Sequence, residues 1–264
     1  MSSLRDVPDA LSRLGRHLID FVYPPVCQVC HQGFVSTNEN IWLCPACDLK
    51  LQIMPSPYCP ICRNILPHAD QKCRNCRRRS YLDWQYSLGV YDEVLSHLIK
   101  ACKYSDRPDI AKMLGTRLAC QLSQFDHLQT IDLVCAVPMH PRKLAKRGFS
   151  QTEILARAVS EGLALEYSPG LLFTKRKSHD QIGLTVQQRF HNVQAVFAVA
   201  DPDTVRGRSV LIVDDVTTSG ATLNSVAHAL HDAGASHIAA ATAAMALEEG
   251  LSPDQLYSMM WEEF

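Results

Sequence analysis

The sequence has no hydrophobic run long enough to cross a membrane and no excess of charge of one sign. None of its apolar stretches approaches the roughly 18 residues that a transmembrane helix needs. Charged side chains are scattered through the first 20 residues, which therefore lack the apolar core of a secretory signal. With 26 basic and 27 acidic residues the net charge is −1, so no general attraction to nucleic acid is expected. These absences favour a cytoplasmic protein without a membrane span.

Glycine and proline are also too few for a collagen-like or low-complexity chain, at 12 and 14 of 264 residues. Hydrophobic residues make up 47% and charged residues 20%, which are ordinary globular values and exclude intrinsic disorder. The length allows one large domain or two modest ones.

Cysteine is the residue in which the chain is unusually rich. Eight of its 11 cysteines form four C-x-x-C pairs: Cys27/Cys30, Cys44/Cys47, Cys59/Cys62 and Cys73/Cys76. This spacing lets one tight turn direct two thiolates at one metal ion, which is typical of structural zinc sites. A disulfide scaffold is the alternative, but it needs an oxidising compartment. The pattern predicts two structural Zn²⁺ ions, each held by two neighbouring pairs, with a cross-braced pairing as the alternative.

The cysteine-rich segment has too little apolar content for a core of its own, so metal must contribute much of its folding energy. From residue 24 to 80 it holds seven basic and three acidic side chains. This positive excess offsets the net negative charge of two four-thiolate zinc sites. We therefore interpret the run Arg77–Arg79 as charge compensation on a solvated face, with a contact to nucleic-acid phosphates as the alternative.

After residue 80 the pattern changes to strands that alternate with helices. Apolar runs predict strands at 86–91, 131–137, 171–174, 195–199, 209–214 and 238–245. Helical periodicity predicts helices at 93–104, 109–122, 150–163 and 222–233. A polar, basic loop is expected at 138–148, and residues 175–192 are mostly polar. The alternation indicates an α/β fold with a parallel, doubly wound sheet.

The most apolar of these strands leads into a turn rich in hydroxyl groups. The strand ends in Asp214 and Asp215, and the residues after it include Thr217, Thr218, Ser219, Gly220 and Thr222. Ligands of open α/β sheets bind beyond the carboxyl ends of the strands, and a helix N-terminus offers N–H groups to a phosphate. The two acids can accept hydrogen bonds from the vicinal hydroxyls of a ribose. A turn that only caps a helix would explain one acid and one hydroxyl, and a P-loop is excluded because no G-K-[ST] follows.

This segment, VLIVDDVTTSGAT at 210–222, resembles the phosphoribosyl-pyrophosphate (PRPP) motif of type I phosphoribosyltransferases. With the four C-x-x-C pairs before it, the chain is similar to the ComF/GntX family, in which a double zinc ribbon is fused to such a transferase domain. The resemblance covers about residues 24–246 and includes VPMHPRK (137–143), KRGFSQ (146–151) and the segment 176–192. The family usually has Asn where this chain has Ser150.

The resemblance implies an α/β fold with a type I phosphoribosyltransferase-like parallel sheet flanked by helices, preceded by a small cysteine-rich zinc-ribbon module. It divides the chain into an N-terminal helical segment (1–23), a double zinc ribbon (24–80), a phosphoribosyltransferase-like domain (81–246) and a tail that could form a short helix (247–264).

The resemblance also implies roles for individual residues. The catalytic candidates are Asp214 and Asp215, which would hold the ribose hydroxyls, and Arg176, which with Lys177 and Arg189 would close a mobile segment over the diphosphate. The 5′-phosphate would be cradled by Thr218, Ser219, Gly220, Ala221 and Thr222. Pyrophosphate would be bound by Arg142 and Lys143 together with Mg²⁺. His140, Lys103 and Tyr104 are weaker candidates for the same pocket.

Three functions are compatible with these residues. The first is a phosphoribosyltransferase with an unknown acceptor, linked to DNA uptake because the family is associated with competence. The second is a non-catalytic PRPP or nucleotide sensor, or a factor that handles single-stranded DNA or a partner protein through the zinc ribbon. In the third, the ribbon only rigidifies the transferase domain.

Overall fold

The computed structural model describes residues 24–35, 42–63, 65–66, 73, 80–175 and 196–247. Several sequence predictions lie outside the described residues. These are the helical segment 1–23, the run Arg77–Arg79, the segment 176–192 with Arg176, Lys177 and Arg189, and the short helix in the tail.

Five parallel strands form the central sheet, in the order β1-β7-β6-β2-β3. Their bounds are β1 Trp84–Val90, β2 Leu133–Ala136, β3 Glu166–Tyr167, β6 Ser209–Thr217 and β7 His237–Met245. The long strands β6 and β7 are paired in register from Ser209↔His237 to Thr217↔Met245. Because helices cover both faces of such a sheet, these strands are nearly continuous apolar runs, and the α/β fold read from those runs is confirmed.

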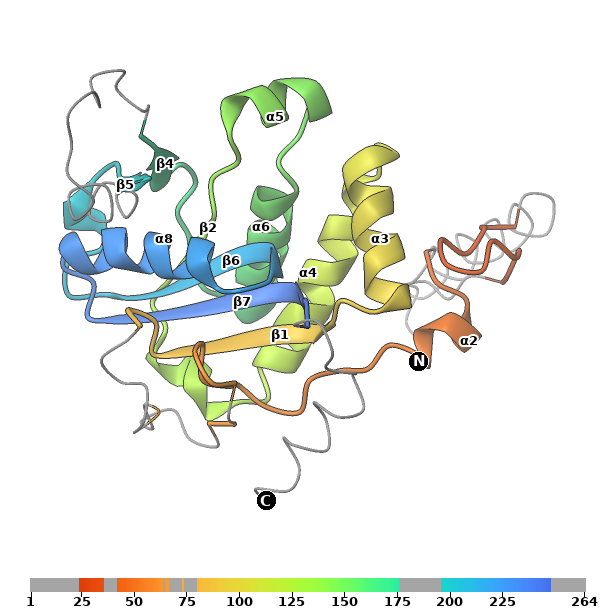
Figure 1. The fold of residues 1–264 in the computed structure, drawn as a ribbon, viewed down its shortest axis with the longest axis horizontal. Coiled ribbons are helices and arrows are strands. Elements are labelled where there is room, and N and C mark those ends of the chain that lie inside the picture. The colour runs from red at the N-terminus through yellow and green to blue at the C-terminus, as the bar shows by residue number, and fades with distance from the viewer. Residues whose placement is uncertain are drawn as a thin grey trace, which may run out of the picture.

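Helices cover the sheet on both sides (Figure 1). One core holds α3 (Glu93–Tyr104), α4 (Pro108–Leu122) and α6 (Gln151–Leu163) against the sheet, and the other core holds α8 (Ala221–Asp232). Helices α4 and α6 pack so closely that a Cβ on Gly115 would lie 2.7 Å from Leu155 O. Two short 3-10 helices, η1 (Asp126–Thr130) and η2 (Pro202–Thr204), join neighbouring elements. In the described part of the chain, no helix has both the length and the apolar character to span a membrane.

A short helix, α5 (Pro141–Arg147), forms where the sequence predicts a basic loop. The residues at its two ends explain why a helix forms here instead of a loop. Pro141 stands in the first turn, and the ring of His140 accepts a hydrogen bond from the Arg142 N–H at 3.2 Å. Gly148, with φ of 84°, ends the helix in the left-handed conformation that glycine adopts without strain. Caps at both ends therefore stabilise a helix that has no buried residue of its own.

The strands predicted at 171–174 and 195–199 are present but do not join the parallel sheet. They are β4 (Leu172–Thr174) and β5 (Phe197–Val199), and they pair antiparallel with each other in a separate two-stranded sheet. The prediction of a parallel sheet therefore holds for the other four predicted strands but not for these two.

The cysteine-rich segment packs against the edge of the sheet beside β1. Isolated antiparallel bridges join Ile53 to Gly89 and Tyr58 to Gln85. The chain approaches so closely that a Cβ on Gly89 would lie 2.5 Å from Gln52 O. Figure 1 shows this segment running alongside β1, away from the short helix α2 (Pro45–Asp48).

The same segment shares its core with the α/β domain. Trp42, Leu43, Met54 and Tyr58 are buried in one cluster with residues of β1, α3 and α4. The Tyr58 hydroxyl lies 2.6 Å from Ser87 Oγ, which in turn lies 2.7 Å from Thr242 Oγ1 in the centre of the sheet. A segment too poor in apolar residues to build a core of its own thus completes the core of its neighbour.

Candidate functional site

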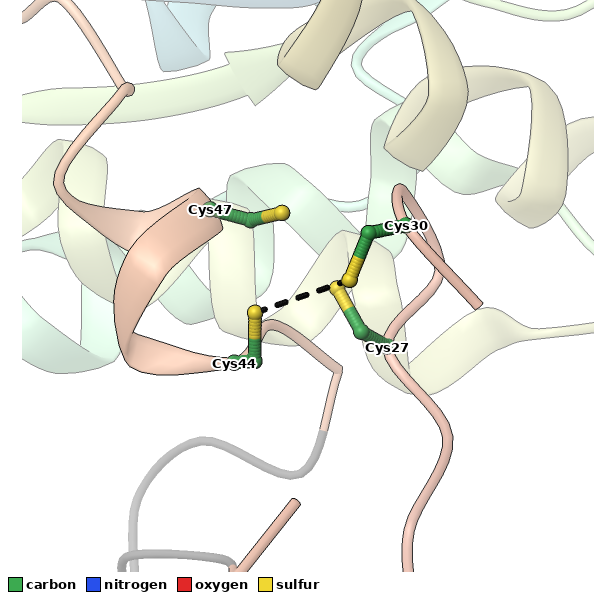
Figure 2. Close-up of side chains that lie close together, drawn as sticks. All are labelled: Cys27, Cys30, Cys44 and Cys47. Carbon is green, nitrogen blue, oxygen red and sulfur yellow. Dashed lines mark hydrogen bonds between the residues drawn. The ribbon is translucent and has the colours of Figure 1, made fainter. Parts of the chain in front are cut away.

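The first cysteine cluster has the geometry of a zinc site. Cys27 and Cys30 come from one turn, Cys44 and Cys47 from the start of α2, and their sulfurs all lie within 4.8 Å of one another. Figure 2 shows the four side chains pointing toward a common centre, with 3.7 Å between the sulfurs of Cys30 and Cys44. A tetrahedral ion with Zn–S bonds of about 2.3 Å requires sulfurs about 3.8 Å apart. The four cysteines therefore fit one Zn²⁺.

The second cluster contains Cys59, Cys62 and Cys73, whose sulfurs also lie within 4.8 Å of one another. The sulfurs of Cys62 and Cys73 are 3.6 Å apart, again the separation expected around zinc. Cys76, the predicted fourth ligand, lies outside the described residues. In both clusters the described ligands come from neighbouring C-x-x-C pairs, as the sequence analysis favoured over a cross-braced arrangement.

The surroundings of these thiols shift their pKa values in opposite directions. Burial opposes ionisation of Cys27, but backbone N–H groups of Cys30, Cys44 and Val29 bond its sulfur and lower its pKa to about 6. Burial raises the pKa of Cys47 to about 12, and the neighbouring thiols add to the effect. Four thiolates this close together repel one another, and a bound Zn²⁺ offsets that repulsion.

A cavity of about 560 Å³ opens at the carboxyl ends of β2 and β6. It is bounded by the end of α3, by α5 and by the start of α6, and α3 and α5 project on the same side of the molecule (Figure 1). Its polar lining is Lys103, Tyr104, His140, Lys143, Lys146, Arg147, Gln151, Thr152, Asp214 and Asp215. The site therefore lies where ligands of parallel α/β sheets bind.

The two acids after the apolar strand both face this cavity but differ in environment. Asp214 is buried, and its Oδ1 accepts the N–H of Asp215 at 2.8 Å. Burial, and then the charge of Asp215, raise the pKa of Asp214 to about 8. Asp215 is more accessible and forms an ion pair with Lys103 Nζ at 2.8 Å. Two carboxyl groups in different environments thus lie side by side at the floor of the cavity.

A chain of polar contacts holds Asp215 in place. Gln151, the first residue of α6, donates its Nε2–H to Asp215 Oδ2 at 2.7 Å, and Arg147 in turn donates to the Gln151 side chain. Ser150 occupies the N-cap of α6 and is buried. Asn, which the family usually has there, is an equally good N-cap, so this departure preserves the start of the helix.

The basic side chains that line the cavity differ in part from those singled out by sequence. Lys143 lines it as predicted, together with Lys103, Lys146 and Arg147. Arg142 is exposed on α5 and does not line it, because the helical turn directs neighbouring side chains to different faces. Lys103 and Gln151 both contact Asp215 directly, although little in the sequence indicated this role. The only signals were the position of Lys103 at a helix end and that of Gln151 in the KRGFSQ segment.

The predicted phosphate loop has the open form that an anion site needs. Gly220, with φ of 73°, forms the N-cap of α8 in the left-handed conformation, which explains the glycine. Thr218, Ser219, Ala221 and Thr222 are exposed around it, and no side chain caps the helix. The N–H groups of the first turn of α8 therefore have no side-chain cap, although the turn is not part of the lining of the cavity itself.

Asp214→Asn should stabilise the protein, and by more at pH 8 than at pH 5. The folded-state pKa of Asp214 is raised from 3.8 to about 8, so in this range the carboxyl holds a proton when folded and loses it when unfolded. Its contribution to the unfolding free energy therefore falls as the pH rises, and Asn has no such dependence. We expect denaturant unfolding to show a gain that is clearly larger at pH 8 than at pH 5. An equal gain at both pH values, or the same gain for the exposed Asp203→Asn, would contradict this origin.

The cysteine-rich part and the α/β part of the chain each match the model of a known protein domain family. Residues 18–79 match the model of the double zinc ribbon domain, and residues 144–263 match the model of the phosphoribosyl transferase domain. The two domain types occur in the order that the sequence analysis expected, and the double zinc ribbon together with the cysteine clusters supports zinc binding.

Relatives of similar length match most of the chain. DNA utilization protein YhgH of Escherichia coli is 28% identical over 220 residues, or 81% of this chain and 94% of that protein. Competence protein F of Haemophilus influenzae is 29% identical over 201 residues, 74% of this chain and 87% of the relative. Competence protein ComFC of Streptococcus pneumoniae is 24% identical over 208 residues, 76% and 86% of the two chains. Among solved structures, the allosteric regulatory enzyme of purine biosynthesis aligns with a TM-score of 0.41 and 20% identity, over 61% of this chain and 37% of the other.

Proposed function

Because the chain belongs to the ComF family, in which a double zinc ribbon precedes a phosphoribosyltransferase domain, we propose that it binds PRPP and transfers its phosphoribosyl group with release of pyrophosphate. One observation carries the proposal. The two carboxyl groups of Asp214 and Asp215 share a cavity with four bases and directly precede a hydroxyl-rich turn at a helix N-terminus. A sugar that bears a phosphate at one end and a diphosphate at the other matches this order of groups.

In this proposal Asp214 and Asp215 bind the ribose. Their oxygens accept hydrogen bonds from the 2′ and 3′ hydroxyls, and the ion pair of Asp215 with Lys103 keeps one carboxylate in position for this. The 5′-phosphate lies on the exposed turn made of Thr218, Ser219, Gly220, Ala221 and Thr222. Its charge interacts favourably with the N-terminus of α8.

The pyrophosphate end of the substrate lies against the basic side chains of α5 in this proposal. Lys143, Lys146 and Arg147 stabilise the negative charge that develops on the leaving group. Arg142 is proposed to contact its outer oxygens from the exposed face of the same helix, and Arg176 is proposed to join them, following the family pattern. Closure of a segment over the cavity would keep water from the activated sugar.

Mg²⁺ is proposed to enter with the substrate. The carboxyl oxygens of Asp214 and Asp215 are the kind of donor this ion prefers, and they face the cavity beside the sugar position. When bound, the ion neutralises diphosphate charge. The protein's own contribution is to orient the ribose with the acids and the leaving group with the bases.

Titration with PRPP, followed by a screen of nitrogenous acceptors for pyrophosphate release, tests the function. We expect saturable PRPP binding that requires a divalent cation, and pyrophosphate release with at least one acceptor. Binding without release in any acceptor mixture would favour the sensor function over the transferase. Absence of binding to the zinc-loaded protein would contradict both.

The names of the relatives favour a role connected with DNA. Three relatives are called DNA utilization or competence proteins, and they match between 74% and 81% of this chain. We therefore propose that the phosphoribosyl chemistry serves DNA uptake or use. The zinc ribbon with Arg77–Arg79 is the candidate contact for single-stranded DNA or a partner protein, because clustered bases bind phosphates.

A further inference from the structure

The second cysteine cluster lies directly against the phosphate loop. Arg63 follows Cys62, and its Nη2 donates a hydrogen bond to the carbonyl oxygen of Thr218 at 3.2 Å. The carbonyl oxygen of Pro60 lies 3.7 Å from the position that a Cβ on Gly220 would take. The knuckle formed by residues 59–63 therefore contacts two residues of the loop that is proposed to bind the 5′-phosphate.

The position of Arg63 is determined by the ribbon, and the ribbon is held on the sheet. Arg63 has left-handed backbone geometry, with φ of 63°, and its N–H donates to the carbonyl oxygen of Cys59 at 3.0 Å. Just before the knuckle, Tyr58 and Gln85 exchange two backbone hydrogen bonds of 2.8 and 3.0 Å. The guanidinium thus reaches the loop from an element anchored to β1, independently of the loop itself.

A second anchor joins the end of the ribbon to the helix that follows the loop. The Oδ1 of Asn224, on α8, accepts hydrogen bonds from Ser80 Oγ at 3.2 Å and from the N–H of Tyr81 at 3.0 Å. The ring of Tyr81 stacks on His228 one turn further along α8, with 4.4 Å between the ring centres. Both ends of the second half of the ribbon are therefore fixed relative to the phosphate loop.

Arg63 adds a charge that the loop does not have. Residues 217–224 contain no basic side chain, and the bases that line the cavity belong to α3 and α5. A guanidinium is permanently charged, and its planar set of five N–H donors can bond a carbonyl and a phosphate oxygen at the same time. Arg63 is half-buried, so a bond to an anion there is screened less than on an open surface.

We propose that Arg63 of the zinc ribbon is a ligand of the 5′-phosphate and completes the phosphate loop from outside the transferase domain. The inference rests on the proposed PRPP site and adds a residue that no part of the PRPP motif contains. In this arrangement the ribbon takes part in substrate recognition, because folding of the knuckle around its cysteines places the guanidinium at the loop.

Calorimetric titration with two probes, ribose 5-phosphate and inorganic pyrophosphate, tests the assignment. Arg63→Ala and Arg63→Gln should each weaken binding of ribose 5-phosphate about tenfold, the usual loss for one charge-assisted hydrogen bond, and should leave pyrophosphate binding unchanged. Gln can still donate to Thr218 but has no charge, so the two variants should behave alike. Arg206→Ala, which removes an exposed arginine paired with Asp203, is the matched control.

Each other outcome overturns the inference. Native affinity of Arg63→Gln for ribose 5-phosphate would show that the side chain only holds Thr218 in place by a hydrogen bond. Equal weakening of both probes would show that Arg63 supports the cavity as a whole. Native affinity in all variants would refute a role for Arg63 while leaving the PRPP proposal intact. A native protein that binds neither probe would refute the PRPP proposal itself, together with this inference.

Discussion

Changing both Asp214 and Asp215 to Asn should weaken PRPP binding at least about tenfold, as expected for the loss of the charge-assisted hydrogen bond to Asp215, without unfolding the protein. Both carboxyl groups face the cavity, and Asn keeps their shape while it replaces one oxygen of each by an NH₂ group and removes the charge of Asp215. The fold should persist because burial of Asp214 already disfavours its ionised form, as its raised pKa shows. Isothermal titration with PRPP measures the binding, and thermal unfolding measures the fold.

Pyrophosphate is the control ligand for this double variant. Removing the negative charge of Asp215 from the cavity makes it more attractive to any anion, so pyrophosphate binding should be unchanged or stronger. Weaker binding of PRPP alone would therefore report the lost ribose contacts. The exposed pair Asp201 and Asp203, changed to Asn in the same way, should leave PRPP affinity as it is. Native PRPP affinity in the Asp214/Asp215 variant would remove the ribose assignment.

The sequence was sufficient for the helices and the longer strands because their signals are local. The helix predicted at 93–104 has those bounds, since apolar residues recur at helical spacing and Asp92 caps the start by accepting the N–H of Leu95 at 3.0 Å. The two-residue strand β3 was missed because Glu166 and Tyr167 offer no apolar run. Helix α5 was missed because its stability comes from its caps rather than from periodicity.

The candidate site was predictable to the extent that it lies on one strand, turn and helix. Asp214, Asp215 and the turn from Thr218 to Thr222 are consecutive, so their spacing already suggests a sugar phosphate site. Lys103 and Gln151 meet Asp215 only because the end of α3 and the start of α6 converge at one edge of the sheet. That convergence depends on strand order, which the sequence pattern does not specify.

The contact between ribbon and sheet was the least predictable feature. Position 89 has no room for a side chain, because a Cβ there would lie 2.5 Å from the carbonyl oxygen of Gln52. Only the structure shows this close approach. In the sequence, nothing distinguishes Tyr58 from the other aromatic residues of the metal-binding segment. In the structure its hydroxyl lies within hydrogen-bonding distance of Ser87, in the strand at the sheet edge. Long-range pairings of this kind have no local signature.

Loss of one zinc ligand should therefore destabilise the transferase domain as well as the ribbon. Cys59→Ser should lower the unfolding free energy by at least about 3 kcal/mol, in the range of mutations that remove a bound metal, and should release one of the two zinc ions. Cys59 is buried directly after Tyr58, which exchanges two backbone hydrogen bonds with Gln85 of β1. Metal analysis and denaturant unfolding measure the two effects.

Hydrogen exchange shows whether the loss of stability in Cys59→Ser extends to the sheet. The N–H of Gln85 donates to Tyr58 O and that of Met54 to Leu88 O, both at 3.0 Å, so both amides should exchange faster in Cys59→Ser. Cys120→Ser is the matched control, since Cys120 is exposed on α4 and belongs to neither described cluster. If Cys59→Ser lost its zinc but kept the stability and the Gln85 protection of the control, the ribbon would be an independent module. The shared core of Tyr58 with β1 argues for the opposite result, in which metal binding and the transferase fold are coupled through one edge of the sheet.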